Sequence, residues 1–477
     1  MTARCTLHMP EQVAEQIFHH LFPGDDREHE LVLLAGLAHI GDELRLLVRE
    51  VVPAREGLDC GVGKYGHRTV KAHFIQPLVR RAREERKVFL SVHNHGGTDS
   101  VSFSVDDWQA HERGYPALLD LADGMPVGAI VFAQNAAAGD IWLPDGRRLQ
   151  IDETRVVGSN VVKMYDSPKK RPFDRTHDEF HDRQTLMFGR KGQEELRTAH
   201  VGIIGVGGVG SLLVEYLSRL GVGTLSIVDP DRIEPSNLSR VVGATRWDTR
   251  YPFSNSAAPK WIRQLALRRA TRKVDIAKRV ALTANPGCQI HTISDDFAKD
   301  SIARQLLGCD FLFLAADSMR ARLVFNAVVQ QYFIPGFQIG TRIESHQGID
   351  TNAYSVVRWV LPGRNCLWCS GMISPHQLAV EAKTEVEVRD QAYGSSVPNP
   401  SVLTMNAVGA SHAVNDFLFS YLGLFHAGVK ADPMRWKHFD RQVVYEKYPP
   451  DQACLECGST EKSRFGQGDS LGLPTVF

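Results

Sequence analysis

The sequence predicts an α/β protein of two domains, with a mixed α/β domain first and a domain built on a mostly parallel sheet second. Its 477 residues exceed the length at which a single hydrophobic core stops growing. Short apolar runs alternate with polar turns over residues 1 to about 155. A β-branched run then enters a glycine-rich turn, and a helix and another strand follow. We expect domains at residues 1–158 and 196–477, with a linker and a first helix over residues 159–195.

The N-terminal domain is expected to contain both strands and helices. Strands are predicted at residues 31–34, 44–52, 88–92 and 127–132, and helices near residues 11–22 and 69–86. From residue 163 to residue 182 the composition changes to Lys169-Lys170-Arg171-Pro172 and repeated Asp, His and Arg. That change predicts a linker.

The C-terminal domain begins with a βαβ unit. Residues 199–204 and 223–228 are predicted strands, and residues 211–220 have helical spacing. The right-handed crossover rule makes these strands parallel. A further buried strand is predicted at residues 311–316.

Composition excludes several classes of protein. With 55 basic and 55 acidic side chains, the chain has no overall field that would attract nucleic acid or an anionic membrane. No apolar run approaches a membrane span, and the N-terminus lacks the apolar core of a signal peptide, so we expect a cytoplasmic protein. Four of the eight cysteines form two Cys-x-x-Cys pairs, which in a reducing compartment favour metal binding.

Two histidines and an aspartate have the spacing of a catalytic zinc site. Such a site needs about three protein ligands and one open position. His93 and His95 stand two residues apart at the end of a strand, so they point to the same side. A carboxylate from the following helix completes the set, and Ser104-x-x-Asp107 supplies one. The alternative is that both histidines bond to backbone groups and that Asp107 is an ordinary first-turn acid.

This pattern resembles the JAMM (JAB/MPN) zinc metallopeptidases, whose fold is cytidine-deaminase-like. The resemblance implies hydrolysis of a peptide or isopeptide bond after the C-terminal glycine of a ubiquitin-like protein, with an upstream glutamate as general base. Glu30 is the better match for that base, and Glu28 is the fallback. Ser104 is expected to hydrogen-bond near the metal or the developing oxyanion. The interval from the second histidine to Ser104 is one residue longer than usual, which leaves Asp106 as an alternative to Asp107.

Gly205, Gly207 and Gly210 form a Gly-x-Gly-x-x-Gly loop, with Gly208 inside it. Such glycines allow a tight turn and let backbone N–H groups approach phosphates at a helix N-terminus. Asp229 ends the next strand, where it is placed for ribose hydroxyls. NAD, FAD and ATP folds share this loop, so the loop alone leaves an NAD(P)-dependent oxidoreductase open.

The residues that follow resemble the ThiF/MoeB and ubiquitin-activating superfamily, over about residues 175–465. The matching residues come in that superfamily's order: Asp231, Asn237, Arg240, Lys273 and Asp317. The resemblance implies that Arg240 and Lys273 bind the triphosphate beside Asn237, and that Asp317 is the Mg²⁺ carboxylate. Arg183 matches an arginine that reaches the phosphates of the neighbouring subunit, so a homodimer is expected. Attack by a carboxylate on the α-phosphate requires such cations, because they neutralise the charge of the leaving pyrophosphate.

Cys366 and Cys369 form one Cys-x-x-Cys pair, and Cys454 and Cys457 form the other. Four thiolates bind zinc tetrahedrally, and each pair can chelate from a turn. Because the pairs lie far apart in the sequence, the fold must assemble the site. The same superfamily carries such a site near its C-terminus. We expect structural zinc here, and the alternative is a redox pair or incidental spacing.

Two features depart from the superfamily pattern. Residues 243–272 lengthen the usual interval between Arg240 and Lys273, and their basic and aromatic content fits either a partner contact or a solvated insertion. Residues 381–399, ahead of a Pro-Ser-Val-x-x-x-Asn motif at residues 400–406, hold no cysteine where many members carry one. Activation is therefore better supported than transfer through a thioester.

The sequence thus predicts an enzyme that uses ATP, Mg²⁺ and two zinc ions, one catalytic and one structural. We expect it to adenylate the C-terminal carboxylate of a ubiquitin-like or sulfur-carrier protein that ends in glycine, and to process the same protein by peptidase action. A conjugating-enzyme homologue is a candidate partner, whereas nucleic acid and membrane are not expected. The alternatives are sulfur-carrier activation for cofactor or cysteine biosynthesis, an NAD(P)-dependent oxidoreductase, and a non-catalytic scaffold.

Overall fold

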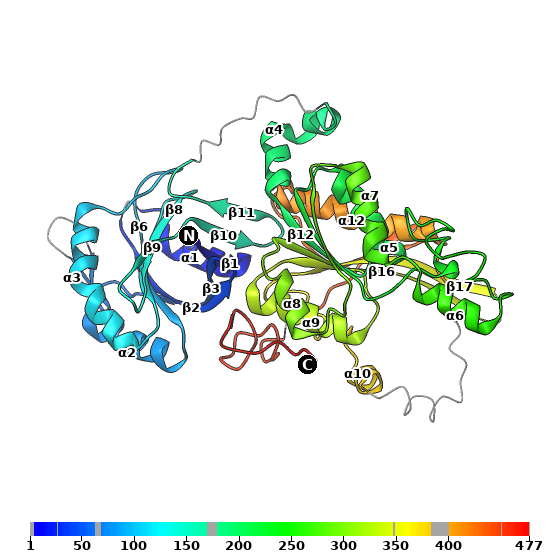
Figure 1. Cartoon of the computed structure of the whole chain (residues 1–477). Coiled ribbons are helices and arrows are strands. Elements are labelled where there is room, and N and C mark those ends of the chain that lie inside the picture. The colour runs from blue at the N-terminus through cyan, green and yellow to red at the C-terminus, as the bar shows by residue number, and fades with distance from the viewer. Residues whose placement is uncertain are drawn as a thin grey trace. The chain divides into compact units, whose positions relative to one another are not determined.

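The computed structural model describes residues 4–25, 27–62, 68–168, 179–346, 349–382, 400–449 and 451–476 (Figure 1). The chain forms two compact units. The first comprises Met1–Arg175, Gln331–Phe333 and Gly458–Gly472, and the second comprises Thr176–Gln330, Ile334–Cys457 and Leu473–Phe477. Among the described residues, no helix is both long enough and apolar enough to cross a bilayer.

The first unit is built on a nine-stranded mixed sheet in the order β11-β10-β1-β3-β2-β6-β7-β8-β9. Its strands are β1 (Arg4–Pro10), β2 (Glu30–Ile40), β3 (Glu43–Pro53), β6 (Val88–Asn94), β7 (Val127–Phe132), β8 (Ala137–Trp142), β9 (Arg148–Gln150), β10 (Glu153–Val157) and β11 (Val161–Met164). A separate hairpin pairs β4 (Cys60–Val62) with β5 (Arg68–Val70), and the helices are α1 (Glu11–Leu21), α2 (Ala72–Glu84) and α3 (Val105–Ala122). The strands and helices expected in this region correspond to β2, β3, β6, β7, α1 and α2.

The centre of this sheet is buried and positions the end of β6. Every residue of β7 is buried, as are five of the seven residues of β6, so these short apolar runs form strands inside the core. β6 pairs antiparallel with β2 and parallel with β7. The histidines at the end of β6 are therefore held by strands on both sides.

The first unit includes segments that the sequence placed elsewhere, among them β11 and Gly458–Gly472. β11 pairs antiparallel with β10, although it lies in the stretch expected as a linker. Its four residues are buried, exposed, intermediate and buried in turn, so they lack the strict alternation that marks a half-buried strand. Gly458–Gly472, expected in the C-terminal domain, returns to β2, where Gly468 bridges to Leu37 and Asp469 accepts a hydrogen bond from the His39 amide at 2.7 Å.

Gly36→Ala is expected to destabilise the first unit. A Cβ at Gly36 would overlap the backbone carbonyl of Gly466 in the returning segment. Relieving that overlap should lower the free energy of unfolding by about 1–3 kcal/mol, as measured by urea denaturation. Gly114→Ala is the control, because a Cβ there meets nothing within 4 Å and alanine favours the middle of α3. Equal stability of the two variants would contradict the packing of the returning segment on β2.

The second unit contains an eight-stranded sheet in the order β14-β13-β12-β15-β16-β17-β18-β19. Its strands are β12 (His200–Ile204), β13 (Thr224–Val228), β14 (Gln289–Ile293), β15 (Phe311–Leu314), β16 (Gly336–His346), β17 (Ile349–Val360), β18 (Met434–Lys437) and β19 (Gln442–Tyr445). Its helices are α4 (Asp182–Thr198), α5 (Gly208–Arg219), α6 (Lys260–Arg268), α7 (Lys273–Ala284), α8 (Asp300–Ala303), α9 (Met319–Tyr332), α10 (Pro375–Glu381) and α12 (Leu403–Tyr421), with short 3₁₀ turns at Pro235–Asn237 and Arg304–Leu306.

This sheet is mostly parallel, as expected, and its strand order creates a binding position. The five strands from β14 to β16 pair in parallel, and β17, β18 and β19 add antiparallel pairs. Figure 1 shows α5, α7 and α12 on one side of the sheet and α8 and α9 on the other. From β12 the chain runs outward to β14 and then returns to β15 on the other side of β12. Ligands of open α/β sheets bind at such a switch point, beyond the carboxyl ends of the strands.

Candidate functional sites

The structure brings His93, His95 and Asp107 together in the first unit, with their ligand atoms within 4.8 Å of one another. The two Nε2 atoms are 3.2 Å apart, and Asp107 Oδ2 lies 3.5 Å from His93 Nε2 and 3.4 Å from His95 Nε2. Zinc with tetrahedral bonds of about 2.0–2.1 Å separates its ligand atoms by about 3.3–3.4 Å. The three donors therefore fit a zinc ion without rearrangement.

Neighbouring groups fix the orientation of these donors. His95 Nδ1 lies 3.0 Å from the carbonyl oxygen of Ser102, an arrangement that directs Nε2 toward the cluster. Ser104 is the N-cap of α3, and its N–H and Oγ–H donate to Asp107 Oδ2 at 2.8 and 2.7 Å. Burial opposes ionisation of Asp107, but hydrogen bonds from His93, His95 and Ser104 hold its pKa well below the ordinary value. Ser104 thus holds the aspartate in place.

Asp107 and Asp106, the two ligand candidates left open by the spacing, differ in position. Asp107 occupies the third position of α3, where the capping box turns its carboxylate back toward Ser104 and the histidines. Asp106 is exposed in the same turn and is not part of the donor group. The capping box is therefore the physical reason that Asp107 faces the cluster.

Glu28 and Glu30, the two candidates for the general base, both lie next to the strand that carries the histidines. Glu28 Oε1 is 3.8 Å from His95 Nε2, whereas Glu30 Oε2 accepts a hydrogen bond from Cys60 Sγ at 3.5 Å. In the antiparallel register Glu30 pairs with His93, so continuing the same register brings Glu28 opposite His95. Glu28 therefore lies beside His95 and Glu30 lies opposite His93, so both stay candidates for the general base.

Asn94, which the sequence did not single out, holds the segment that carries Glu28. Its Oδ1 accepts the His29 amide at 2.6 Å, and its Nδ2 donates to the Arg27 carbonyl at 3.2 Å. These hydrogen bonds hold the backbone at Arg27 and His29, on both sides of Glu28. Asn94 itself is buried. Its position between the two histidines could have identified it from the sequence, because strand alternation turns the side chain of Asn94 to the face opposite the two histidines.

Asn94→Ala is expected to loosen the backbone around Glu28. Loss of the buried acceptor should speed hydrogen exchange of the His29 amide by about 10-fold to 100-fold, because an unmade hydrogen bond of this kind costs about 1–3 kcal/mol. Exchange measured by NMR or mass spectrometry tests this without substrate or metal. Asn135→Ala, which removes an exposed bond to Asp99, should leave His29 unchanged. Unaltered exchange in Asn94→Ala would show that Asn94 does not anchor the segment.

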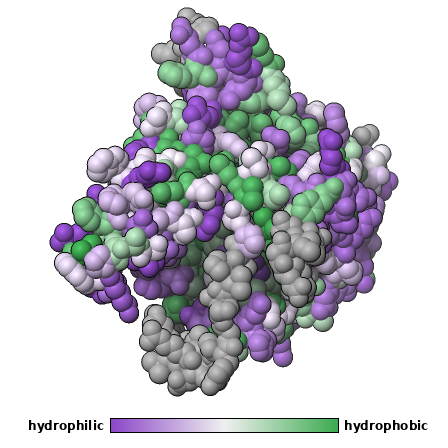
Figure 2. Space-filling view, turned by 90° about the vertical axis from the view of Figure 1, so that its right-hand side faces the viewer, coloured by the Kyte–Doolittle hydropathy of each residue, from purple (hydrophilic) through white to green (hydrophobic). Residues whose placement is uncertain are grey.

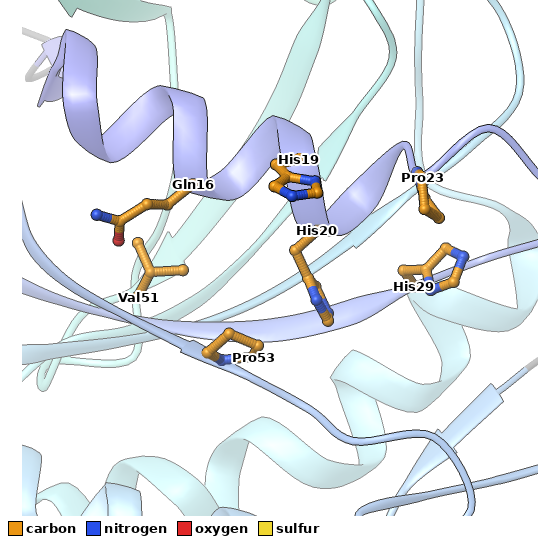
Figure 3. Close-up of a pocket in the computed structure, with 7 residues that line it drawn as sticks. All are labelled: Gln16, His19, His20, Pro23, His29, Val51 and Pro53. Atoms are coloured by element: carbon orange, nitrogen blue, oxygen red, sulfur yellow. The ribbon is translucent and has the colours of Figure 1, made fainter.

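A cavity of about 470 Å³ adjoins the same segment (Figure 3). Its lining residues are Gln16, His19, His20, Pro23, His29, Val51 and Pro53. Figure 3 shows the rings of His20 and His29 facing the same space, and their centroids are 6.0 Å apart. His20 Nε2 bonds to the Glu30 carbonyl and His29 Nε2 to Asp25 Oδ1, so both rings are already oriented.

In the second unit, the glycine loop lies between the carboxyl ends of β12 and β15. Gly205 has φ +86°, and a Cβ there would stand 2.8 Å from the Ala316 amide nitrogen. A Cβ at Gly210 would overlap the Gly205 carbonyl. These two positions therefore require glycine. The tight turn starts α5 at Gly208, so the N-terminus of α5 lies at the switch point.

Asp229, at the end of β13, braces this loop. Its Oδ2 accepts the Val206 amide at 2.8 Å and its Oδ1 accepts the Asp231 amide at 2.9 Å. Burial raises the pKa of Asp229, and the nearby Lys273 opposes that rise. The carboxylate is thus engaged with the loop backbone, and its remaining lone pairs are the ones placed for ribose hydroxyls.

Lys273 and Arg240 converge on the same loop. Lys273 Nζ lies 2.7 Å from Asp231 Oδ2 and 3.9 Å from Asp229 Oδ1. Arg240 Cδ would be 3.4 Å from a Cβ at Gly208. Asn237 is buried, and its carbonyl accepts the Arg240 amide at 3.0 Å, so it shapes the turn that presents Arg240.

Asn406, the last residue of the Pro-Ser-Val-x-x-x-Asn motif, also reaches the loop. Its Nδ2 would contact a Cβ at Gly208, and it donates to Ser401 Oγ at 3.1 Å. The sequence identified this motif but did not place Asn406 in the site. Residues 383–399, which precede the motif and were noted for lacking cysteine, lie outside the described residues.

Asp317 lies near the glycine loop, whereas Arg183 does not contact the loop residues. Asp317 is exposed one residue beyond Ala316, which contacts Gly205, so it lies at the carboxyl end of β15. α9 begins just after it, with the Met319 amide donating to Glu381 Oε1 at 2.8 Å. Arg183 is exposed on α4, and within the described parts of the chain it forms no hydrogen bond or ion pair with the loop residues.

The four cysteines of the two Cys-x-x-Cys pairs come together, with Sγ atoms within 4.8 Å of one another. Cys369 Sγ and Cys457 Sγ are 3.6 Å apart, close to the roughly 3.8 Å edge of a tetrahedral zinc site with bonds of about 2.3 Å. A hydrogen bond with Cys457 lowers the pKa of Cys366 to about 6. None of these four cysteines forms a disulfide, so their sulfur atoms suit a zinc ion.

Asn326 of α9 joins the two halves of this cysteine cluster. Its Oδ1 accepts the Leu367 amide at 2.9 Å, and its Nδ2 donates to Glu456 Oε2 at 3.1 Å. Asn326 is fully buried. The bridge ties a turn that follows β17 to a turn near the C-terminus, which explains how distant pairs share one site.

Comparison with known proteins matches one family model to most of the second unit. Residues 181–466 match the ThiF family. The tRNA threonylcarbamoyladenosine dehydratase of Escherichia coli is 26% identical over 150 residues, 31% of this chain and 48% of that protein. The SAMP-activating enzyme E1 of Haloferax volcanii is 29% identical over 164 residues, 34% of this chain and 53% of that protein. The sulfur carrier protein ThiS adenylyltransferase of Bacillus subtilis is 29% identical over 217 residues, which are 42% of this chain and 56% of that protein. The chain spans about half the length of these relatives.

Proposed function

Because the chain belongs to the ThiF family, we propose that its second unit adenylates the C-terminal carboxylate of a small ubiquitin-like or sulfur-carrier protein. The observation that carries this proposal is the convergence of Lys273 and Arg240 on the glycine loop at the switch point. Relatives named as a SAMP-activating enzyme and a ThiS adenylyltransferase support the class of substrate. An NAD(P)-dependent oxidoreductase would leave these cations without a role.

In the proposed reaction, a carboxylate oxygen of the carrier protein attacks the α-phosphorus of ATP. An acyl–phosphate bond forms, the bond to the bridging oxygen breaks, and pyrophosphate leaves with that electron pair. Lys273 and Arg240 stabilise the negative charge that develops on the phosphates. Asp317 would hold Mg²⁺, which supplies further charge neutralisation. Amides of the glycine loop at the start of α5 bind phosphate oxygens.

We further propose that the first unit processes the same carrier protein as a peptidase or isopeptidase. His93, His95 and Asp107 would hold a zinc ion, which supplies a Lewis acid that lowers the pKa of a bound water. Glu30, or Glu28 as the fallback, would receive the proton as general base. Ser104 keeps the Asp107 carboxylate aimed at the histidines. The four-cysteine cluster would hold a second, structural zinc.

The remaining elements of the proposal concern partners and location. Arg183 on α4 is proposed to reach the phosphates of a second copy in a homodimer, and a conjugating-enzyme homologue is proposed to receive the activated protein. A cytoplasmic location is proposed, and the two Cys-x-x-Cys pairs, which favour metal binding in a reducing compartment, support it. Sulfur-carrier activation for biosynthesis is the second candidate, favoured by the ThiS adenylyltransferase relative.

ATP–pyrophosphate exchange tests the adenylation proposal. Incubation with ThiS or SAMP proteins should produce exchange that requires the carrier's C-terminal glycine. Calorimetry on the same preparation should show binding of ATP with Mg²⁺ and none of NAD⁺. Binding of NAD⁺ in preference to ATP would refute the proposal and favour the oxidoreductase.

Metal analysis tests the first unit. After dialysis against a weak chelator, the wild-type chain should retain two zinc ions, and Asp107→Asn should retain one, because an amide is a weaker zinc ligand than a carboxylate. Asp106→Asn is the matched control, since Asp106 precedes it in the same helical turn, and should retain both. Equal loss in both variants, or no loss in either, would argue against the proposed ligand set.

A further inference from the structure

The segment between Arg240 and Lys273 has an unusual charge for this chain. Residues 243–272 hold seven arginines and lysines and a single acidic residue, Asp248, whereas the whole chain has equal numbers of both. All seven cations are exposed. The surface of this segment is therefore strongly cationic within a chain of zero net charge.

Asp248 does not neutralise these cations, because its carboxylate forms an ion pair with Arg279, outside the segment. It is 5% exposed and accepts hydrogen bonds from Thr245 and from Arg279 of α7, the latter at 3.1 and 2.8 Å. None of the seven cations forms an ion pair with another side chain in the described parts of the chain. Their charge faces solvent unopposed.

The segment is folded and fixed to the second unit. Ala270 packs with Ile233, Val241 and Ile276 in a small apolar cluster. The Thr271 amide donates to the Asp248 carbonyl at 2.9 Å. Its backbone therefore has internal order, and its exposed side chains are presented from a defined scaffold.

Large apolar side chains project from the same segment. Trp247 is 81% exposed, Phe253 61%, Trp261 69% and Leu265 45%. Trp261 and Leu265 are four residues apart on α6, so they share one helix face, and Arg268 continues that face. Figure 1 shows α6 at the right-hand end of the second unit, on the side that Figure 2 turns to the viewer, where hydrophilic surface borders a central hydrophobic area. Exposed Trp, Tyr and Arg together are typical of interface hot spots.

We propose that this segment is a docking surface for an acidic face of the small protein that the second unit adenylates. The inference rests on the proposed function, because that substrate must present its C-terminus to Arg240 and Lys273, which flank the segment in the chain. Unopposed cations select an acidic partner and steer its approach. The Trp261–Leu265 pair favours a protein over a nucleic acid, because an aliphatic side chain beside an indole fits an apolar patch rather than a stack of bases.

Binding of defined probes to the full chain tests the proposal. A fluorescent peptide of repeated Glu-Glu-Leu-Phe units should bind, and its affinity should fall steeply with added sodium chloride. A peptide in which glutamine replaces each glutamate should bind less well. The double variant Trp261→Ala with Leu265→Ala should lower the affinity for the acidic peptide by about tenfold or more. The double variant Arg268→Glu with Arg269→Glu should lower that affinity by at least as much. The control pair is Phe439→Ala and Lys430→Glu, which alter exposed residues elsewhere in the same unit and should change nothing.

Three outcomes would overturn the docking surface: no binding of the acidic peptide, equal binding by all variants, or tighter binding of an oligothymidylate of matched charge. The last would make the segment a nucleic-acid surface. Probe binding needs neither ATP nor catalysis, so it can fail while carrier-dependent exchange succeeds. Exchange can likewise fail while the peptide still binds, which would refute adenylation and the identity of the docked substrate but not the acidic-peptide site itself.

Discussion

Lys273→Ala is expected to lower the rate of carrier-dependent ATP–pyrophosphate exchange by about 10²-fold or more. The ammonium lies beside Asp231 and Asp229 at the glycine loop, where it would meet the triphosphate in the proposed reaction. Its loss would leave the phosphate charge opposed by two carboxylates. It would also remove the group that restrains the pKa of Asp229, so this buried carboxyl would protonate more readily as pH falls.

Lys278→Ala provides the matched control for that experiment. Lys278 is on the same helix, α7, but is exposed and away from the loop. Exchange rates and calorimetric ATP affinities should match those of the wild-type chain. If Lys273→Ala retained full exchange, the triphosphate would have to lie elsewhere, and the assignment of the switch point as the nucleotide site would be wrong.

The local signals of the second unit were enough to predict its glycine loop. The run before Gly205, the loop glycines and the strand that ends at Asp229 are adjacent in the sequence, and each has a short-range physical meaning. The structure realises them as β12, α5 and β13, with Gly205 and Gly210 in contacts that exclude any side chain. Local order and local sterics therefore carried most of this prediction.

Contacts between distant segments could not be predicted in the same way. The choice between Glu28 and Glu30 depends on the register of β2 against β6, which the sequence does not encode locally. The approach of Asn406 to Gly208 joins α12 to α5 across the fold. The return of Gly458–Gly472 to β2 likewise depends on the close backbone approach of Gly36 and Gly466, which no periodic pattern in the sequence predicts.

Cys454→Ser is expected to have the largest effect on stability. The serine hydroxyl is a poor zinc ligand, so the variant should bind one zinc fewer than the wild-type chain. Structural zinc contributes about 10–16 kcal/mol in small zinc-dependent folds, and loss of even a fraction of that should lower the Tm by about 10 °C or more. Differential scanning calorimetry with metal analysis measures both effects.

The position of the cysteine cluster explains why this effect should spread. The cluster ties the turn after β17 to the turn that ends at Cys457, and Asn326 of α9 bridges both turns. The segment that returns to β2 begins at Gly458, directly after this cluster in the sequence. Cys288→Ala, at a buried cysteine outside the cluster, should keep both zinc ions and cause only the modest loss of a small core truncation. Unchanged zinc content in Cys454→Ser would instead mean that the four thiols are close without binding metal, and the stability of this region would then rest on the Asn326 bridge alone.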